Sequence, residues 1–371
     1  MSRPTWFQRF LLPGFAFKAV VIGGGYATGR ELAEFFLPSG PWGGVAGMLL
    51  AMAIWSAVCV VTFLFALQVG ARDYRSFFRG LLGPAWGAFE LAYLLFLIVV
   101  LAVFGAAAGA IGEAIFHWPK LAGTLALVAG IAGVTTFGNS SVERLFKWVT
   151  FFLYGVYALF VVLELSHFSG AVATAFKQSV PTTGWALGGL TYAGYNVIGA
   201  VVILPVVRHL TGRRDAIVAG LIAGPLAMLP ALLFFICMCA DYPAIRDAAL
   251  PSDLLLRQLH QPIFHVIFQV MIFSALLESG TGLVNAINER AAATHLARTG
   301  RTLAPSARLA VATVVLIGSV FLADRFGLVT LIARGYRLLA YVFLAVYVAP
   351  LMTWGLWRLR QGQAQAVSTP A

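Results

Sequence analysis

The run GGGYATG at residues 23–29 interrupts the first apolar segment of this chain. Each glycine in a helix interior costs about 1 kcal/mol relative to alanine, so the run predicts a break in a helix. At such a break, the free N–H groups suit a carboxylate, and the free C=O groups suit an ammonium group or a metal ion. Unpaired backbone at membrane depth is tolerated only where it is buried in protein or lines a polar cavity. The run therefore predicts a binding site inside the bilayer.

A similar stretch, GGLTYAGYN at residues 188–196, opens the sixth apolar segment and predicts a second break at Tyr192–Asn196. The tyrosines and the asparagine supply hydrogen-bonding groups, and the glycines allow close approach of a ligand. The alternative is that these glycines serve tight packing of helices. The predicted solute site comprises Gly23, Gly24, Gly25, Tyr26, Ala27, Thr28, Gly29, Tyr192, Ala193, Gly194, Tyr195 and Asn196.

Glu278 lies in the middle of an apolar segment, where a carboxylate costs several kcal/mol unless it is paired, protonated or hydrated. Ser274 precedes it by one helical turn and Thr281 follows by one, so the three share a face, with Ser279 beside them. We predict that Glu278, Ser274, Ser279 and Thr281 take part in coupling to a cation, either sodium or a proton. The alternative for Glu278 is a structural pair with an arginine.

Three charged residues directly follow the first predicted break. Arg30 and Glu34 have the i, i+4 spacing of a helical ion pair. Glu31 points elsewhere, and we expect Arg334 or Arg337 as its partner. We predict that Glu31 acts as a gate or in coupling.

The elements that position these residues are membrane spans. The chain of 371 residues is 60% hydrophobic and 11% charged, with a mean hydropathy of +0.89, whereas soluble domains carry about 25% charged residues. At about 20 apolar residues per span, the sequence predicts ten spans, at 13–36, 43–70, 85–116, 120–137, 143–164, 183–208, 214–240, 262–290, 307–323 and 335–357. We expect residues 359–371 to form a disordered cytoplasmic tail.

The basic residues explain the formal charge of +11. They concentrate in the short connections on one side of the predicted spans, which predicts that both termini are cytoplasmic. No basic patch interleaved with aromatic residues is present, so the expected partners are the lipid bilayer and a small-molecule solute, not nucleic acid. Cys59, Cys237 and Cys239 all lie in apolar segments, which predicts neither a disulfide framework nor a resident cofactor.

The two glycine stretches open the first and the sixth predicted spans, five spans apart. A unit of five spans begins and ends on opposite sides of the membrane, so a second copy enters upside down. We predict an inverted repeat, 1–165 and 166–358, with the solute near the midplane between the two breaks.

GGGYATGRELAEFF at residues 23–36, the predicted break at Tyr192–Asn196 and the span count resemble the YkvI-type bacterial membrane proteins. That group is similar to the amino-acid/polyamine/organocation transporters with the LeuT fold. The resemblance implies an all-α polytopic protein of the bacterial inner membrane, with discontinuous first and sixth helices. The group commonly has glutamine where this chain has Arg30.

The same resemblance implies roles for individual residues. In LeuT-fold relatives the eighth span contributes oxygen ligands for sodium, which makes Ser279 and Thr281 candidate sodium ligands. In some proton-coupled relatives a lysine of the fifth span takes the place of sodium, which makes Lys147 a coupling candidate. Its alternative is a snorkelling lysine at the cytoplasmic end of the span.

We therefore expect a secondary active transporter, a cation-coupled symporter of a small polar, amino-acid-like solute that works by alternating access. The alternatives are a solute-binding membrane sensor and a passive channel with a transporter-like fold. An intramembrane enzyme needs a nucleophile–base pair or metal ligands at membrane depth. Only Glu278 stands out there, so we do not expect an enzyme.

Overall fold

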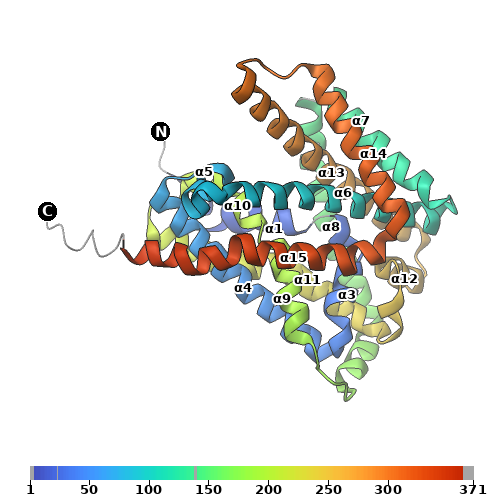
Figure 1. Ribbon diagram of the computed structural model, residues 1–371. Helices are drawn as coiled ribbons and strands as arrows, with labels where there is room; N and C mark the ends of the chain where they lie inside the picture. The colour runs from blue at the N-terminus through green and yellow to red at the C-terminus, as the bar shows by residue number, and fades with distance from the viewer. Residues whose placement is uncertain (1–3, 23, 138–139, 362–371) are drawn as a thin grey trace.

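The computed structural model describes residues 4–22, 24–137 and 140–361, and these residues form helices without a strand (Figure 1). The α-helices are α1 (Leu12–Val21), α2 (Gly24–Ala27), α3 (Arg30–Phe35), α4 (Gly40–Val69), α5 (Tyr74–Leu82), α6 (Gly87–Phe116), α7 (Lys120–Phe137), α8 (Ser140–Lys177), α9 (Trp185–Asn196), α10 (Gly199–Val202), α11 (Arg213–Met238), α12 (Pro251–Gln258), α13 (Pro262–Thr299), α14 (Pro305–Thr330) and α15 (Arg337–Phe343). The short 3₁₀ and π helices are η1 (Phe7–Leu11), η2 (Leu37–Ser39), η3 (Gly83–Trp86), η4 (Leu204–His209), η5 (Cys239–Asp241), η6 (Ala244–Asp247), η7 (Leu331–Tyr336), η8 (Leu344–Val348) and η9 (Leu351–Gly355).

The first apolar segment is broken where its glycines predict. Helix α1 ends at Ile22, whose ψ of 76° leaves the helical region, and the four-residue α2 follows. A second interruption separates α2 from α3, because Gly29 has a φ of 77° that favours glycine. A Cβ at Gly29 would also lie 2.8 Å from Cε1 of Phe234. The break thus depends on both backbone conformation and packing.

The break predicted at Tyr192–Asn196 is in the wrong place. Those residues form the last turns of α9, and the α-helix is interrupted only at 197–198, after which α10 and the 3₁₀ helix η4 follow. The paired glycines serve packing instead. A Cβ on Gly188 would lie 2.0 Å from the carbonyl oxygen of Phe35, and one on Gly189 would lie 2.4 Å from that of Gly47.

The long helices form two groups. In the first group, α4 packs on α9 and α11, and α11 packs on α1; in the second, α6, α7, α13 and α14 all pack on one another. Figure 1 shows α7, α13 and α14 together at the upper right and α4, α9 and α11 below α15. Helix α8 contacts α11 of the first group and α13 of the second, while α15 contacts α9 and α6.

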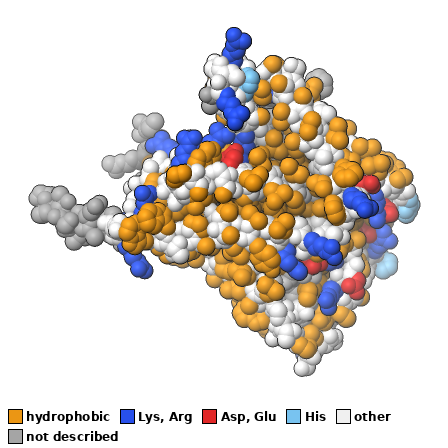
Figure 2. Space-filling view, in the orientation of Figure 1, with side chains coloured by type: hydrophobic (Ala, Val, Ile, Leu, Met, Phe, Trp, Pro, Cys, Tyr) orange, Lys and Arg blue, Asp and Glu red, His pale blue; other side chains and the backbone are white. Residues whose placement is uncertain are grey.

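The surface of the protein is apolar along its long helices. Six stretches of the described residues are long and apolar enough to cross a membrane. They are Arg30–Val69, Tyr74–Phe116, Phe151–Lys177, Arg213–Asp241, Pro262–Leu296 and Pro305–Gln361. On α14, Val314, Ile317 and Phe321 lie on one face and are 71%, 64% and 68% exposed. Figure 2 shows hydrophobic side chains over most of this view. The protein is therefore a multi-pass membrane protein, whereas the count of ten spans and the inverted repeat stay predictions.

One predicted boundary changes and one stays a prediction. The predicted boundary between the repeats at 165/166 lies within α8, close to the kink at Phe168 (φ −119°, ψ 15°), and stays a prediction. The last helix runs on to Gln361, so residues 359–361 do not belong to the predicted tail. Residues 362–371 lie outside the described part of the chain.

Candidate functional site

The first and sixth apolar segments meet at a buried carboxylate. Glu31 on α3 is 4% exposed, and the hydroxyl of Tyr195 on α9 donates a hydrogen bond to its Oε2. The expected arginine partner of Glu31 is therefore wrong. Arg337 lies instead 3.9 Å from Oε1 of Glu34, and Arg30 pairs with Glu34 at 2.7 Å, as its spacing predicts.

Tyrosines surround this carboxylate. The hydroxyls of Tyr26 and Tyr157 are 3.0 Å apart, and Tyr157 donates to the Pro230 carbonyl oxygen at 3.1 Å. The ring centroids of Tyr195 and Tyr336 are 4.5 Å apart. Tyr157 lies within α8 without a charged neighbour, and Tyr336 ends the π helix η7 between Gly335 and Arg337. The sequence drew attention to the arginines beside Tyr336 and not to the tyrosine itself.

Tyr192 differs from its neighbours. It is fully buried, and its hydroxyl has no hydrogen-bond partner among the described residues. Its ring centroid lies 5.5 Å from that of Trp55, 4.9 Å from that of Phe36 and 5.7 Å from that of Tyr195. A buried hydroxyl without a partner costs about 1–3 kcal/mol, so this group suits a ligand.

Most other predicted site residues form hydrogen bonds or packing contacts within the protein itself. The Arg30 amide donates to Oγ1 of Thr28 at 3.2 Å, and Nδ2 of Asn196 donates to the Tyr192 carbonyl oxygen at 3.1 Å. Trp55 Nε1 donates to the Ala193 carbonyl oxygen at 3.3 Å. A Cβ on Gly194 would lie 3.0 Å from Cβ of Ala340, and Ala27 is buried. Gly24 and Gly25 form part of α2, whereas Gly23 lies outside the described residues.

Arg30 ties the first segment to the connection that follows α11. Its Nη1 donates to the carbonyl oxygens of Arg246 and Ala248 at 2.8 and 2.9 Å. The Ser252 amide donates to the Thr28 carbonyl oxygen at 3.0 Å. We call these contacts the Arg30 clamp. It closes one side of the molecule over the break.

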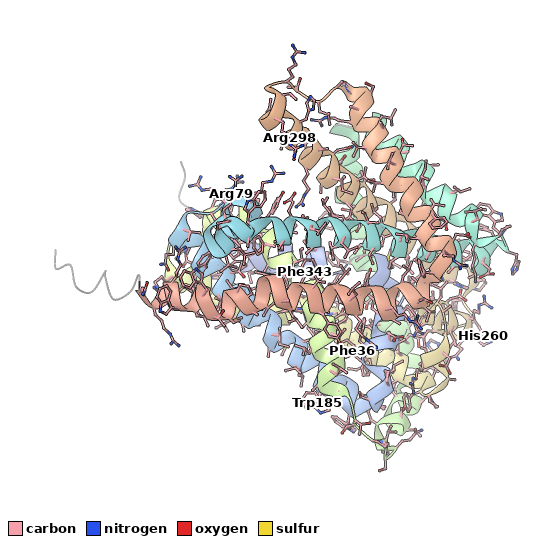
Figure 3. The ribbon with its side chains drawn as sticks, viewed as in Figure 1. Phe36, Arg79, Trp185, His260, Arg298 and Phe343 are labelled. Atoms are coloured by element: carbon pink, nitrogen blue, oxygen red, sulfur yellow. The ribbon has the colours of Figure 1, made fainter. Side chains whose placement is uncertain are left out.

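The cavity at the break is much smaller in volume than the cavity on the other side of the molecule. The cavity at the break, lined by Tyr26, Tyr157 and Pro230, holds about 10 Å³, roughly one water. A cavity of about 430 Å³ lies between the two helix groups, where α5, α6 and α13 face α10 and η4. Figure 3 shows Arg298 of α13 at the top of the view, Arg79 of α5 below it to the left, and His260 at the right. Arg75 and Arg290 line the large cavity, and Arg79 and Arg298 lie on two of its helices, so we call this side of the molecule the basic side.

Four of the predicted coupling residues lie on α13, which packs against α2. They are Ser274, Glu278, Ser279 and Thr281. The hydroxyls of Ser274 and Thr281 donate to the carbonyl oxygens of their own helix, at Val270 and Leu277, both at 2.8 Å. Glu278 is half-buried and forms no salt bridge within the described residues, which argues against the arginine pair.

The sodium role of Ser279 and Thr281 and the coupling role of Lys147 stay predictions. The side chain of Ser279 is half-buried. The Lys147 side chain lies outside the described residues. Among the residues that the structure describes, no three His, Cys, Asp or Glu side chains form a group that could hold a metal ion.

Comparison with family models finds no match for this chain. Over 270 residues the chain is 23% identical to the uncharacterised membrane protein YkvI of Bacillus subtilis, covering 72% of this chain and 77% of that protein. Its structure is similar to that of MhsT in complex with L-phenylalanine, with a TM-score of 0.60, 14% identity and coverage of 97% and 96% of the two chains. It is also similar to a Na⁺-coupled sialic acid symporter in a substrate-bound, outward-open state, with a TM-score of 0.59, 14% identity and coverage of 95% and 81%. The chain therefore has the LeuT fold that the sequence resemblance implied.

Proposed function

We propose that this protein is a secondary active transporter that moves a small polar, amino-acid-like solute and couples this movement to a cation gradient. The observation that carries the proposal is the buried meeting of two interrupted segments through Glu31 and Tyr195. Polar groups at membrane depth are costly and mark solute or ion pathways. The solved structures of similar fold include an L-phenylalanine complex and a Na⁺-coupled symporter, which supports this function.

The chemistry of the cluster favours an amino-acid-like solute. The Glu31 carboxylate suits an ammonium group, and the free hydroxyl of Tyr192 can donate to a carboxylate or hydroxyl. The aromatic rings of Trp55, Phe36 and Tyr336 suit the apolar part of such a solute. The cavity at the break holds about one water in this structure. Solute binding therefore requires the cluster to open.

The arrangement of the two helix groups supports alternating access. The Arg30 clamp closes one side, and the cavity of about 430 Å³ opens on the other. Tilting the group of α1, α4, α9 and α11 against the group of α6, α7, α13 and α14 would open the side that the Arg30 clamp closes. The same movement would close the side that holds the large cavity. The coupling cation is sodium or a proton, with Glu278, Ser279 and Thr281 as candidate ligands and Lys147 as an alternative.

Uptake by purified protein in liposomes tests this function. We expect saturable accumulation of one or more amino acids above equilibrium, dependent on an inward sodium or proton gradient. Tyr192→Phe should weaken solute affinity, because it removes the free hydroxyl. The exposed Tyr341→Phe should not. Equilibration without accumulation would indicate a channel, and binding without uptake would indicate a sensor.

A further inference from the structure

Glu164 is a buried carboxyl that the proposed solute site does not use. It lies within α8 and is 1% exposed, and neither of its oxygens has a hydrogen-bond partner among the described residues. An ionised carboxylate in such a place is far too costly to persist alone. The group must therefore be protonated or neutralised by a cation.

Asp241 lies close to Glu164. It ends η5, the short helix that follows α11 and packs against α8, and its charge acts on Glu164. Its Oδ1 accepts a hydrogen bond from Nε2 of Gln258 at 2.9 Å, whereas its Oδ2 is buried without a partner in the described structure. The two carboxyls thus present three acceptor oxygens without a donor.

Among the residues whose side chains the structure describes, no arginine, lysine or histidine forms an ion pair with either carboxyl. His167, three residues after Glu164, is exposed and bonds the Leu163 carbonyl oxygen, and Lys18 lies over the ring of Tyr154, ten residues before Glu164. Helix α11 contributes the Cys237 thiol. On α13, His265 is bound to Asp253 at 2.7 Å. Glu278 lies further along that helix, where it acts on Tyr154 of α8. Helix α4 contains no Asp, Glu, His, Lys or Arg.

We propose that Glu164 and Asp241 form a proton-binding site that holds one proton between them. A proton from water binds one Glu164 oxygen, which then becomes an O–H donor for Oδ2 of Asp241. One proton therefore removes one negative charge and pairs two of the three free acceptors. A metal ion fits less well, because hard cations take six or more oxygen ligands and this pair offers three.

The proton site lies on the same face of α8 as the solute cluster. Tyr157, which bonds Tyr26 at the break, precedes Glu164 by seven residues, or about 10 Å along the helix. Asp241 follows α11, which belongs to the first helix group. In a transporter of the proposed kind, tilting of that group would change the contact between the two carboxyls and so link proton binding to the solute site. This link rests on the proposed function, whereas the proton site itself does not.

Infrared spectroscopy of the purified protein tests the site without solute or gradient. In D₂O at pH 7, we expect a C=O stretching band of a protonated carboxyl that is absent in Glu164→Gln. The band should disappear as the pH rises. Glu113→Gln is the matched control, because the side chain of Glu113 is 56% exposed and lies 3.4 Å from Lys120. This control should keep the band.

Asp241→Asn gives a second measurement. Removing a like charge makes the Glu164 proton easier to lose, so the pH at which the band disappears should fall by about one unit or more. A spectrum unchanged by Glu164→Gln would overturn the proposal. So would loss of the band on addition of Na⁺ or Mg²⁺ at constant pH, which would indicate a metal-ion site. Failure of uptake with the band intact would instead count against the proposed transport function.

Discussion

At the scale of residues, one buried hydrogen bond joins the two segments of the candidate site. Tyr195 is the only described residue that hydrogen-bonds the Glu31 carboxylate, and Tyr195 lies between the rings of Phe35 and Tyr336. A hydrogen bond to a charged group contributes about 1.5–3 kcal/mol, more than a bond between neutral groups. The contact therefore stabilises the closed arrangement of α3 and α9 and fixes the orientation of Glu31.

Tyr195→Phe should destabilise the protein by about 1–3 kcal/mol, because the aromatic contacts remain while the carboxylate loses its donor. Thermal unfolding in detergent measures this loss as a lower midpoint. Tyr341→Phe is the matched control, since Tyr341 is 49% exposed, and it should change stability by less than about 0.5 kcal/mol. Equal unfolding midpoints for the two variants would show that the Glu31–Tyr195 hydrogen bond does not stabilise the protein.

Asp73 provides a pH-dependent contribution outside the membrane spans. It caps α5 by accepting hydrogen bonds from the amides of Arg75 and Ser76, both at 2.9 Å, and from the Ser76 hydroxyl at 2.7 Å. Burial raises the pKa of the Asp73 carboxyl, but these hydrogen bonds outweigh burial, so its pKa lies below the ordinary value. The folded pKa is thus below the unfolded pKa of about 3.9. The contribution is complete above the unfolded pKa and is lost as the pH falls through the folded pKa.

Asp73→Ala should cost about 0.5–2 kcal/mol at pH 7, the usual range for loss of a helix cap. The difference in unfolding midpoint between wild type and variant should shrink as the pH falls from 5 to 3. Asp324→Ala, at an exposed position, should show no such difference at either pH. A destabilisation by Asp73→Ala that is constant over this range would show that the charged carboxylate is not what caps α5.

At the scale of elements, glycines determine how closely the helices approach. Helix α9 packs on α4 and α3 with backbone against backbone, since Gly188 faces the Phe35 carbonyl and Gly189 faces the Gly47 carbonyl. Small residues at such interfaces are typical of membrane helices.

Gly188→Ala should destabilise the protein by about 1–3 kcal/mol or more, because the new Cβ would lie 2.0 Å from a backbone oxygen that cannot rotate away. Gly155→Ala on α8 is the control. Nothing lies within 4 Å of the Cβ position there, so the substitution should be neutral or stabilising by up to about 1 kcal/mol. Thermal unfolding of the two variants measures both effects, and the reverse order of stability would contradict this role of Gly188.

The contrast between the two glycine stretches shows what a sequence can and cannot predict. The run before Gly29 breaks its helix, and a residue with a φ of 77° favours glycine wherever it occurs, so a local pattern suffices. Gly188 and Gly189 have the same local appearance, but their role is set by Phe35 and Gly47 on other segments. Contacts with other segments decide whether a glycine stretch breaks its helix or allows close packing. The local sequence does not show those contacts.

The same limit applies to the charged residues. The i, i+4 spacing of Arg30 and Glu34 is local, and the pair is present at 2.7 Å. The partner of Glu31 comes from α9, 164 residues away, and tyrosine was not among the expected partners. Glu164 has His167 one helical turn away, but His167 is exposed and bonds the Leu163 carbonyl oxygen. The proximity of Glu164 to Asp241 could be found only from the packing of α8 against η5.

At the scale of the whole molecule, access to the buried cluster is asymmetric. The contacts of Arg30, Thr28 and Ser252 close one side, while the cavity lined by Ala293 and Arg290 opens on the basic side. The protein's native cysteines are all buried, so an introduced cysteine can report on access at either side.

Arg30→Met should open the side that the Arg30 clamp closes and close the side that holds the large cavity. The guanidinium donates two hydrogen bonds across the clamp, at 2.8 and 2.9 Å, and their loss removes about 1.5–3 kcal/mol per bond from the closed clamp, where about 1.4 kcal/mol corresponds to a factor of about ten. With Arg30 intact, a membrane-impermeant thiol reagent should label Ala293→Cys and leave the buried Ser252→Cys unlabelled. Added Arg30→Met should raise labelling of Ser252→Cys about tenfold or more and lower labelling of Ala293→Cys.

The second effect distinguishes alternating access from local loosening. If the clamp were only a local contact, Arg30→Met would expose position 252 and leave position 293 unchanged. If the two helix groups move as units, opening one side must close the other, so the two labelling rates change in opposite directions. Arg325→Met is the control, because Arg325 is exposed and forms no ion pair within the described residues. It should alter neither rate, and a rise at both positions in the Arg30→Met protein would exclude a rigid-body exchange.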